Sequence, residues 1–484
     1  MSILIKNVKI FGSFKKYPEV KDVFIKRDKI AAIGNFSGKF GDIIIDRQKS
    51  YLFPGFIDVS TTSDRYLGLL TNPSQEDFLS QGVTTIIGGT GGISLAPLSF
   101  KIFESLSKWA DLSKINFDWQ DFKSFSSVMS KKKIGVNFAS LVGYNNLFSL
   151  FNDKKIGVNL ISNQLRASLL NGAFGLSYEV GNKQKWPSEI ESLIYDVADR
   201  NGVFMPHFDN CQEFYDIIFE LFKDISSVRN KNAKIILSHF MPINKNENDY
   251  LKSLKLIEDE KKHKIYFSIF PINENILPIS NFLPKWAQEK DKKTILKDKW
   301  LSKKIISDIK NTEIEDAIIV EAEKNNFLVG KTIKELSEIY NTNPKDALFE
   351  LIKATNFHSL LAIKNINLKL VQKVINHPQA LIGSCAASLD KKYRFKSARS
   401  SETFSKFLEL SLASNTLEDA VKKISFLPAE IFNLKKRGMV AEGYYADLVL
   451  WKDKKPEMVI VNGKIAYEDG AVKGLNGQFL RHNG

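Results

Sequence analysis

Residues 51–64, YLFPGFIDVSTTSD, decide how the rest of the chain is interpreted. Their apolar run ends in the polar segment 60–64, as expected of a buried strand that leads into a loop. A second apolar run, 82–89, ends in the glycine-rich segment TGG at 90–92. The two stretches predict the first two strand-to-loop junctions of an α/β barrel, with functional residues at the strand ends.

Apolar segments alternate with amphipathic helical patterns along the middle of the chain, which is typical of parallel βα units. They predict a (β/α)₈ TIM-like barrel, whose functional site lies at the carboxyl ends of the strands. The last two predicted strands are far apart in the sequence, so we expect a helical insert over about 280–365, between strands 7 and 8. The predicted strands are Leu52–Ser60, Thr84–Gly89, Gly135–Gly143, Ala173–Glu179, Val203–Phe208, Ala233–Phe240, Ile265–Pro271 and Leu381–Cys385.

Both ends of the chain are rich in short β-strand patterns. Residues 1–50 contain three segments with many β-branched residues, and Asn462-Gly463 near the other end is a strong tight-turn signal. Neither group is long enough to bury a core alone. We therefore expect a small β-sandwich domain made from residues 1–52 and 433–484, with the barrel domain over 53–432.

Composition narrows the class of protein. The 484 residues include 69 Lys and Arg against 55 Asp and Glu, a formal net charge of +14, but the charge is dispersed and no recognition motif accompanies it. We expect no nucleic-acid partner. No apolar run is long enough to cross a bilayer and the N-terminus has no signal-peptide core, so we expect no membrane partner and a cytoplasmic location. The only cysteines, Cys211 and Cys385, exclude a disulfide framework. The oligomeric state cannot be read from the sequence.

Several short motifs, weak one by one, are specific in their order and spacing. Together they resemble the amidohydrolase superfamily, and within it the D-aminoacylases and N-acyl-D-amino-acid deacylases. The resemblance implies a barrel with a β-sandwich built from both termini, and hydrolysis of an amide C–N bond with one or two divalent metals, usually zinc. The motifs are Pro54–Asp58, Gly82–Thr85, Gly92–Pro97, Gly172–Ser177, Leu283–Ala287, Ile382–Ser384, Leu427–Glu430, Arg437-Gly438 and Glu442–Leu448.

The positions that the resemblance assigns to metal ligands are mostly replaced. The His-x-His of the first strand corresponds to Ser60 and Thr62, whose hydroxyls are poor zinc ligands. The cysteine that follows the second strand corresponds to Gly91, which has no side chain. Cys385 stands in place of the catalytic aspartate, and a thiol does not replace a carboxylate as general base without a depressed pKa.

Two ligand positions are retained, His207 and His239 on the fifth and sixth strands. With Cys385 they could hold one zinc ion with an open position. The alternative, which we favour, is that no metal binds, the histidines are hydrogen-bonded relics and Cys385 is an inert buried thiol. A nucleophilic pair of Cys385 with a histidine is a weaker third interpretation. Four further residues are interpreted as strand-end, loop or packing residues: Asp58, Asp64, Glu179 and Cys211.

These observations favour a degenerate amidohydrolase that has lost the metal-dependent deacylase reaction. Such a protein would bind a small molecule, such as an N-acyl amino acid, or a partner protein. The first alternative is an active C–N hydrolase with a mononuclear zinc site on His207, His239 and Cys385. The second is a non-catalytic scaffold whose basic surface binds an acidic partner.

Overall fold

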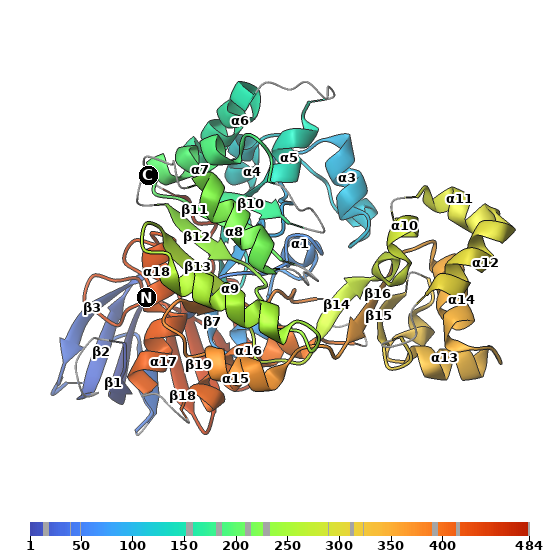
Figure 1. Ribbon diagram of the computed structural model, residues 1–484. Coiled ribbons are helices and arrows are strands. Elements are labelled where there is room, and N and C mark those ends of the chain that lie inside the picture. The colour runs from blue at the N-terminus through green and yellow to red at the C-terminus, as the bar shows by residue number, and fades with distance from the viewer. Residues whose placement is uncertain are drawn as a thin grey trace.

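The chain folds into a sheet built from its two ends, a central α/β body and a smaller lobe that projects from that body (Figure 1). The computed structural model describes residues 1–12, 19–38, 40–48, 50–151, 158–180, 186–208, 214–225, 233–288, 290–309, 314–322, 324–389, 395–412 and 417–482. Cys211, which the sequence suggested as a packing residue, lies outside these described residues.

Both ends of the chain contribute to one nine-stranded sheet, in the order β21-β20-β19-β18-β5-β1-β2-β3, with β4 beside β1. The two ends meet where β5 pairs with β18, which sets Leu52 opposite Leu450. Aliphatic side chains from both ends, among them Ile3 and Ile460, share one buried cluster. The strands are β1 Ser2–Ile10, β2 Glu19–Lys26, β3 Lys29–Gly34, β4 Ile43–Asp46, β5 Tyr51–Pro54, β18 Leu448–Lys452, β19 Lys455–Val461, β20 Lys464–Glu468 and β21 Ala471–Val472.

The central body holds two sheets of parallel strands. One has the order β6-β7-β8 and the other β17-β13-β12-β11-β10-β9. Backbone hydrogen bonds join the two sheets: the Val59 amide donates to the Ile382 carbonyl at 3.4 Å, and the Phe174 amide donates to the Ser140 carbonyl at 3.0 Å. The strands are β6 Phe56–Asp58, β7 Val83–Gly88, β8 Asn137–Ser140, β9 Val142–Gly143, β10 Gly175–Glu179, β11 Val203–His207, β12 Lys234–Leu237, β13 Lys264–Ile269 and β17 Ala380–Ile382.

The predicted strand Leu52–Ser60 was wrong as a single element. It divides at Gly55 into β5, which belongs to the sheet of the two chain ends, and β6, which belongs to the parallel sheet. The chain passes close to β7 at this crossing, because a Cβ on Gly55 would lie 2.0 Å from Thr84 Oγ1. The Gly55 amide donates to the Asp447 carbonyl at 2.7 Å, which keeps the crossing tied to the chain end.

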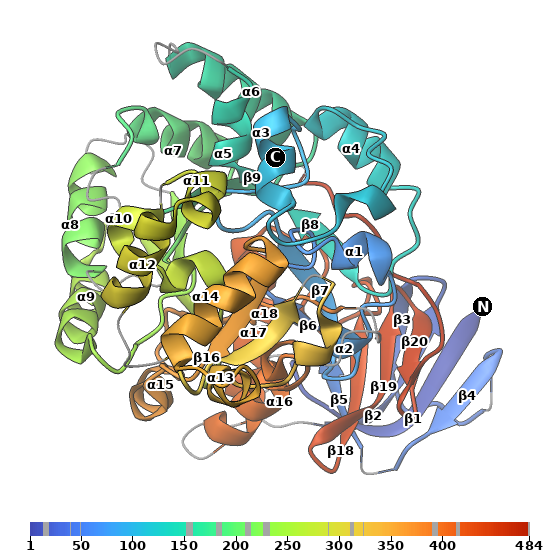
Figure 2. The ribbon, with the colours of Figure 1, turned by 90° about the vertical axis from the view of Figure 1, so that its right-hand side faces the viewer.

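Helices cover the outside of the parallel strands (Figures 1 and 2). In α8, for example, Phe214, Ile218 and Leu221 share a helical face and are buried. No helix in the described part of the chain is long and apolar enough to span a membrane. The helices are α1 Gly68–Thr71, α2 Glu76–Leu79, α3 Phe100–Leu106, η1 Leu112–Lys114, α4 Phe122–Met129, α5 Tyr144–Ser149, α6 Val158–Leu170, α7 Ile190–Asp199, α8 Phe214–Asp224, α9 Glu247–Asp259, α15 Leu368–Val374, α16 Ala398–Ser411, α17 Leu417–Ile424 and α18 Phe426–Ile431.

The lobe lies between β13 and β17 and has a core of its own, which includes Ile305, Leu336 and Leu351. Besides the helices predicted for about 280–365, it contains an antiparallel sheet, β14-β16-β15, that the sequence analysis missed. These strands have only four or five residues each, too few for a clear alternating pattern. The elements are β14 Asn275–Pro278, η3 Ile279–Phe282, α10 Lys285–Gln288, α11 Lys292–Lys297, α12 Lys299–Asp308, β15 Ile318–Ala322, η5 Asn326–Leu328, α13 Ile333–Ile339, α14 Pro344–Thr355 and β16 Ser359–Ile363.

Candidate functional site

The ends of β6, β11, β12 and β17 bring Ser60, His207, His239 and Cys385 together, and all four are buried. A series of hydrogen bonds links three of them through Ser238. Cys385 Sγ lies 3.3 Å from Ser60 Oγ, Ser60 Oγ lies 3.1 Å from Ser238 Oγ, and Ser238 Oγ lies 3.1 Å from His207 Nδ1. The rings of His207 and His239 stand 5.3 Å apart between centroids.

Asp58 holds the strand ends in position. Its Oδ1 accepts hydrogen bonds from the amides of Ser60, at 3.1 Å, and Ser384, at 3.0 Å. Its Oδ2 is buried without a hydrogen-bond partner, and burial raises the pKa of the carboxyl to about 7. Asp58 thus fastens the end of β6 to the loop after β17, which carries Cys385.

Both histidines are neutral near pH 7. Burial lowers the pKa of His207 well below its usual value, and it lowers the pKa of His239 to about 3. The positive charges of Arg65 and Arg399 act in the same direction on both rings. Two cationic side chains therefore lie close enough to influence the histidines that the resemblance assigns to a metal.

The Arg65 guanidinium fills the space beside Gly91. Its Nη2 donates to the carbonyl of Thr90 at 2.8 Å and to that of Gly91 at 3.4 Å. A Cβ on Gly91 would lie 2.1 Å from this Nη2, so a side chain there would require the guanidinium to move. Arg65 was not predicted as a site residue, because nothing in the neighbouring sequence distinguishes a buried arginine from an exposed one.

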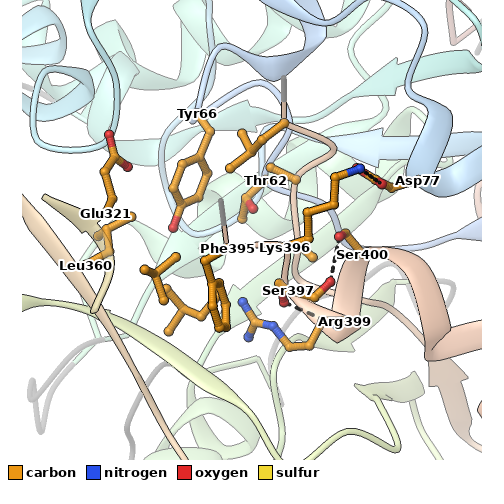
Figure 3. Close-up of a pocket in the computed structure, with 15 residues that line it drawn as sticks. Thr62, Tyr66, Asp77, Glu321, Leu360, Phe395, Lys396, Ser397, Arg399 and Ser400 are labelled. Atoms are coloured by element: carbon orange, nitrogen blue, oxygen red, sulfur yellow. Dashed lines mark hydrogen bonds and ion pairs between the residues drawn. The ribbon is translucent and has the colours of Figure 1, made fainter. Parts of the chain in front are cut away.

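A pocket lies between these strand ends and the sheet of the lobe (Figure 3). Arg399 of α16 reaches into it, with its guanidinium carbon 5.2 Å from the centroid of the Phe270 ring. Arg399 Nε and Thr62 Oγ1 are buried without hydrogen-bond partners. The pocket is lined by Thr62, Tyr66, Asp77, Ile276, Val320, Glu321, Leu360, Ala386, Ala387, Leu389, Phe395, Lys396, Ser397, Arg399 and Ser400.

Asp64 and Glu179, the other two carboxylates considered from the sequence, make different contacts from Asp58. Asp64 is buried, and its Oδ2 accepts a hydrogen bond from the Gly89 amide at 2.6 Å. Burial raises the pKa of Asp64. Glu179, at the end of β10, is exposed and accepts a long hydrogen bond of 3.5 Å from Asn145 Nδ2. Asp64 therefore fixes the loop after β7, and Glu179 faces solvent.

The residues present do not fit the metal centre that the resemblance implies. Ser60 and Thr62 offer hydroxyls and Gly91 offers no side chain, so of these ligand positions only His207 and His239 keep a strong zinc ligand. Among the described residues, no group of three His, Cys, Asp or Glu side chains is placed to hold a metal ion. The Arg65 guanidinium would in addition repel a divalent cation.

The fold and the position of this site are those of α/β proteins with functional groups at the carboxyl ends of parallel strands. The amidohydrolase family model matches residues 346–466. The N-acyl-D-aspartate deacylase of Alcaligenes xylosoxydans xylosoxydans is 23% identical over 454 residues, which cover 89% of this chain and 81% of the relative. The D-aminoacylase of the same organism is also 23% identical, over 444 residues that cover 89% and 84%.

Solved structures agree with these relatives. The crystal structure of N-acyl-D-glutamate deacylase from Bordetella bronchiseptica, complexed with zinc and a phosphonate inhibitor, has a TM-score of 0.79 to this chain. The match covers 99% of each chain at 19% sequence identity. The resemblance to the D-aminoacylase branch of the amidohydrolase superfamily is therefore confirmed, and it extends over nearly the whole chain.

Proposed function

We propose that this chain is a degenerate member of the D-aminoacylase branch, which binds a small N-acyl amino acid without metal-dependent hydrolysis. The hydrogen-bonded series from Cys385 through Ser60 and Ser238 to His207 carries this proposal. Where an active site would hold strong ligands free for a metal, these polar groups satisfy one another. Cys385, at the catalytic aspartate position, takes part in the series through its sulfur, 3.3 Å from Ser60 Oγ.

The pocket supports a small acidic ligand. Among the described residues no carboxylate forms an ion pair with the Arg399 guanidinium, so a ligand carboxylate would supply the missing counter-charge. Opposite it, Ile276, Val320 and Leu360 from the lobe form an apolar wall suited to an acyl chain or an apolar side chain. One carboxylate and one apolar group are the features that N-acyl amino acids share.

The test is elemental analysis of the purified protein together with titration calorimetry and a hydrolysis assay, all with N-acetyl-D-glutamate. We expect far less than one zinc ion per chain, no hydrolysis, and binding that Arg399→Gln weakens by about tenfold or more. About one zinc ion per chain, with hydrolysis that His207→Ala and His239→Ala both abolish, would overturn the proposal.

The alternative of an active hydrolase with a mononuclear zinc site on His207, His239 and Cys385 is supported by their common location at the strand ends, although the three side chains would have to move to hold one ion. In that case Cys385→Ser should weaken zinc binding by about tenfold or more, since a hydroxyl is a poor zinc ligand. Equal zinc content in Cys385→Ser and the wild type would exclude the thiol as a ligand.

We also propose that the two parallel sheets close into one eight-stranded barrel, in which β8 and β9, separated by one residue, count as one strand. The proposed domain limits are 1–52, 53–432 and 433–484, with β5 continuing two residues past the first limit to Pro54. The bonds from Val59 to Ile382 and from Phe174 to Ser140 support closure, because they join the sheets at both edges. We separately propose a cytoplasmic location, which the lack of a disulfide framework supports.

A further inference from the structure

We propose that the position of the lost metal centre is an anion-binding site, in which the Arg65 guanidinium and the Thr62 hydroxyl hold a carboxylate of the ligand. This inference rests on the proposed function, because a zinc ion and the guanidinium would compete for one place. It adds a second cationic side chain, one that is not among the residues lining the pocket, to the contacts proposed for the ligand.

Arg65 is a buried cation for which no ion pair is found among the described residues. Its side chain belongs to a residue only 8% exposed, and its known polar contacts are the carbonyls of Thr90 and Gly91. Its Nε has no hydrogen-bond partner, and among the described residues no carboxylate lies within ion-pair distance of the guanidinium. Because burying an unpaired charge is costly, an anionic ligand at this point would be bound favourably.

The surroundings of Arg65 are shaped for its guanidinium. Gly91 has a φ of +67°, and a Cβ there would lie 2.1 Å from Nη2, so glycine is what makes room for the cation. On another side the Trp109 ring supports the guanidinium carbon at 5.1 Å, and Tyr66 packs edge-on against Trp109 at 5.4 Å. The charge is thus held in one place before any ligand arrives.

Thr62 supplies a second donor on the same turn. The Tyr66 amide donates to the Thr62 carbonyl at 3.0 Å, so residues 62–66 form a helical turn that brings side chains three apart to one side. Thr62 is 7% exposed, its Oγ1 has no partner, and it lines the pocket (Figure 3). Thr62 therefore offers its hydroxyl to an anion in the pocket, and Arg65, three residues along the same turn, is the cation that we assign to the same anion.

The carboxylates nearby leave this site free for an anion. Asp77, in the pocket wall, is 3.0 Å from Lys396 Nζ. Glu321 belongs to β15 of the lobe, on the other side of the pocket in Figure 3. Asp64 is buried, bonds to the Gly89 amide and interacts electrostatically with Arg65, but burial raises the pKa of its carboxyl, which reduces its negative charge. Arg399 adds a further positive charge, so the net field at the strand ends favours an anion.

The experiment compares acetate with acetamide, its uncharged analogue, at constant ionic strength. Tryptophan fluorescence is the readout, and a signal that disappears in Trp109→Phe reports on Arg65. We expect saturable binding of acetate but not of acetamide. Arg65→Gln should weaken acetate binding by about tenfold or more, and Arg65→Lys should retain part of it. Arg47→Gln, which alters an arginine paired with Glu468 on the sheet of the chain ends, is the matched control.

Equal acetate affinity in the wild type and in Arg65→Gln, with both shown by circular dichroism to be folded, would overturn the anion site. So would equal binding of acetate and acetamide, or no binding of either. The zinc content of the purified protein distinguishes a failure of the proposed anion site from a failure of the proposed function. A metal-free protein without acetate binding loses only the anion site, whereas a zinc-loaded hydrolytic protein loses the proposed function as well.

Discussion

At the scale of single residues, Asp58 shows how a strand end is held at an energetic cost. Its carboxyl is buried, it accepts two amide hydrogen bonds through one oxygen, and the other oxygen has no partner. Burial raises its pKa from 3.8 to about 7. The folded protein therefore retains a proton on Asp58 over a pH range in which the unfolded chain has released it.

Asp58→Asn should remove a pH-dependent component of stability. Because the folded pKa of Asp58 is the higher one, its contribution is fully present below about pH 4 and is lost as the pH rises to about 7. Asparagine keeps the accepting oxygen and cannot ionise. Between about pH 4 and pH 8 the free energy of unfolding of the wild type should therefore fall by up to about 4 kcal/mol relative to that of Asp58→Asn.

Urea unfolding at several pH values measures this difference. Asp118→Asn, at an exposed position, is the control, and its stability should follow the wild type at every pH. Parallel curves for Asp58→Asn and the wild type would show that Asp58 does not titrate as its burial implies.

The identities of single residues predicted part of the candidate site but not all of it. Ser60, Thr62 and Gly91 could be located because they interrupt motifs that are otherwise retained. The role of Arg65 could not be predicted, since it depends on a contact with Gly91, 26 residues away, and on the burial of its charge. Nor could the link from Ser238 to His207 and Ser60 be foreseen, because a serine beside a retained histidine carries no signal of its own.

At the scale of elements, the crossing at Gly55 determines which strand enters which sheet. The apolar run 51–59 indicates a strand throughout, and periodicity alone cannot reveal that it leaves one sheet and joins another. Close approach decides it: the backbone of Gly55 lies against Thr84 of β7, at the start of the parallel sheet. The strands of the lobe were missed for a related reason, since short antiparallel strands between helices have too few residues to show a period.

Gly55→Ala should therefore destabilise the protein by about 3 kcal/mol, because the new Cβ would overlap Thr84 Oγ1 and the backbone must shift. In the Thr84→Gly background the overlapping atoms are gone, so Gly55→Ala should cost less stability there than it costs in the wild type. Gly34→Ala is the matched control, because its Cβ would meet only the Phe36 ring at 3.6 Å, and it should cost far less. Thermal unfolding of all four variants decides between overlap and a general intolerance of substitution.

At the scale of the whole molecule, a buried polar network joins the sheet of the chain ends to the parallel strands. Arg437 Nη1 donates to Asp447 Oδ2, and the same oxygen accepts from Asn137 Nδ2 of β8 at 3.1 Å. Asp447 Oδ1 accepts from the Asn462 amide at 2.8 Å. Arg437 and Asp447 belong to motifs that revealed the resemblance, but their partner Asn137 is 310 residues from Asp447, so their joint role required the structure.

Asp447→Asn should destabilise the whole molecule by about 3 to 5 kcal/mol, because it leaves the Arg437 charge buried without its partner. Glu468→Gln removes the half-buried partner of Arg47, near the edge of the same sheet, and should cost less than about 1 kcal/mol, which makes it the matched control. Guanidinium unfolding followed by tryptophan fluorescence and circular dichroism measures both. If the network couples the two parts, both signals shift together in Asp447→Asn. A change confined to one signal, or a cost no larger than that of Glu468→Gln, would mean that the sheet of the chain ends and the parallel strands are stabilised independently.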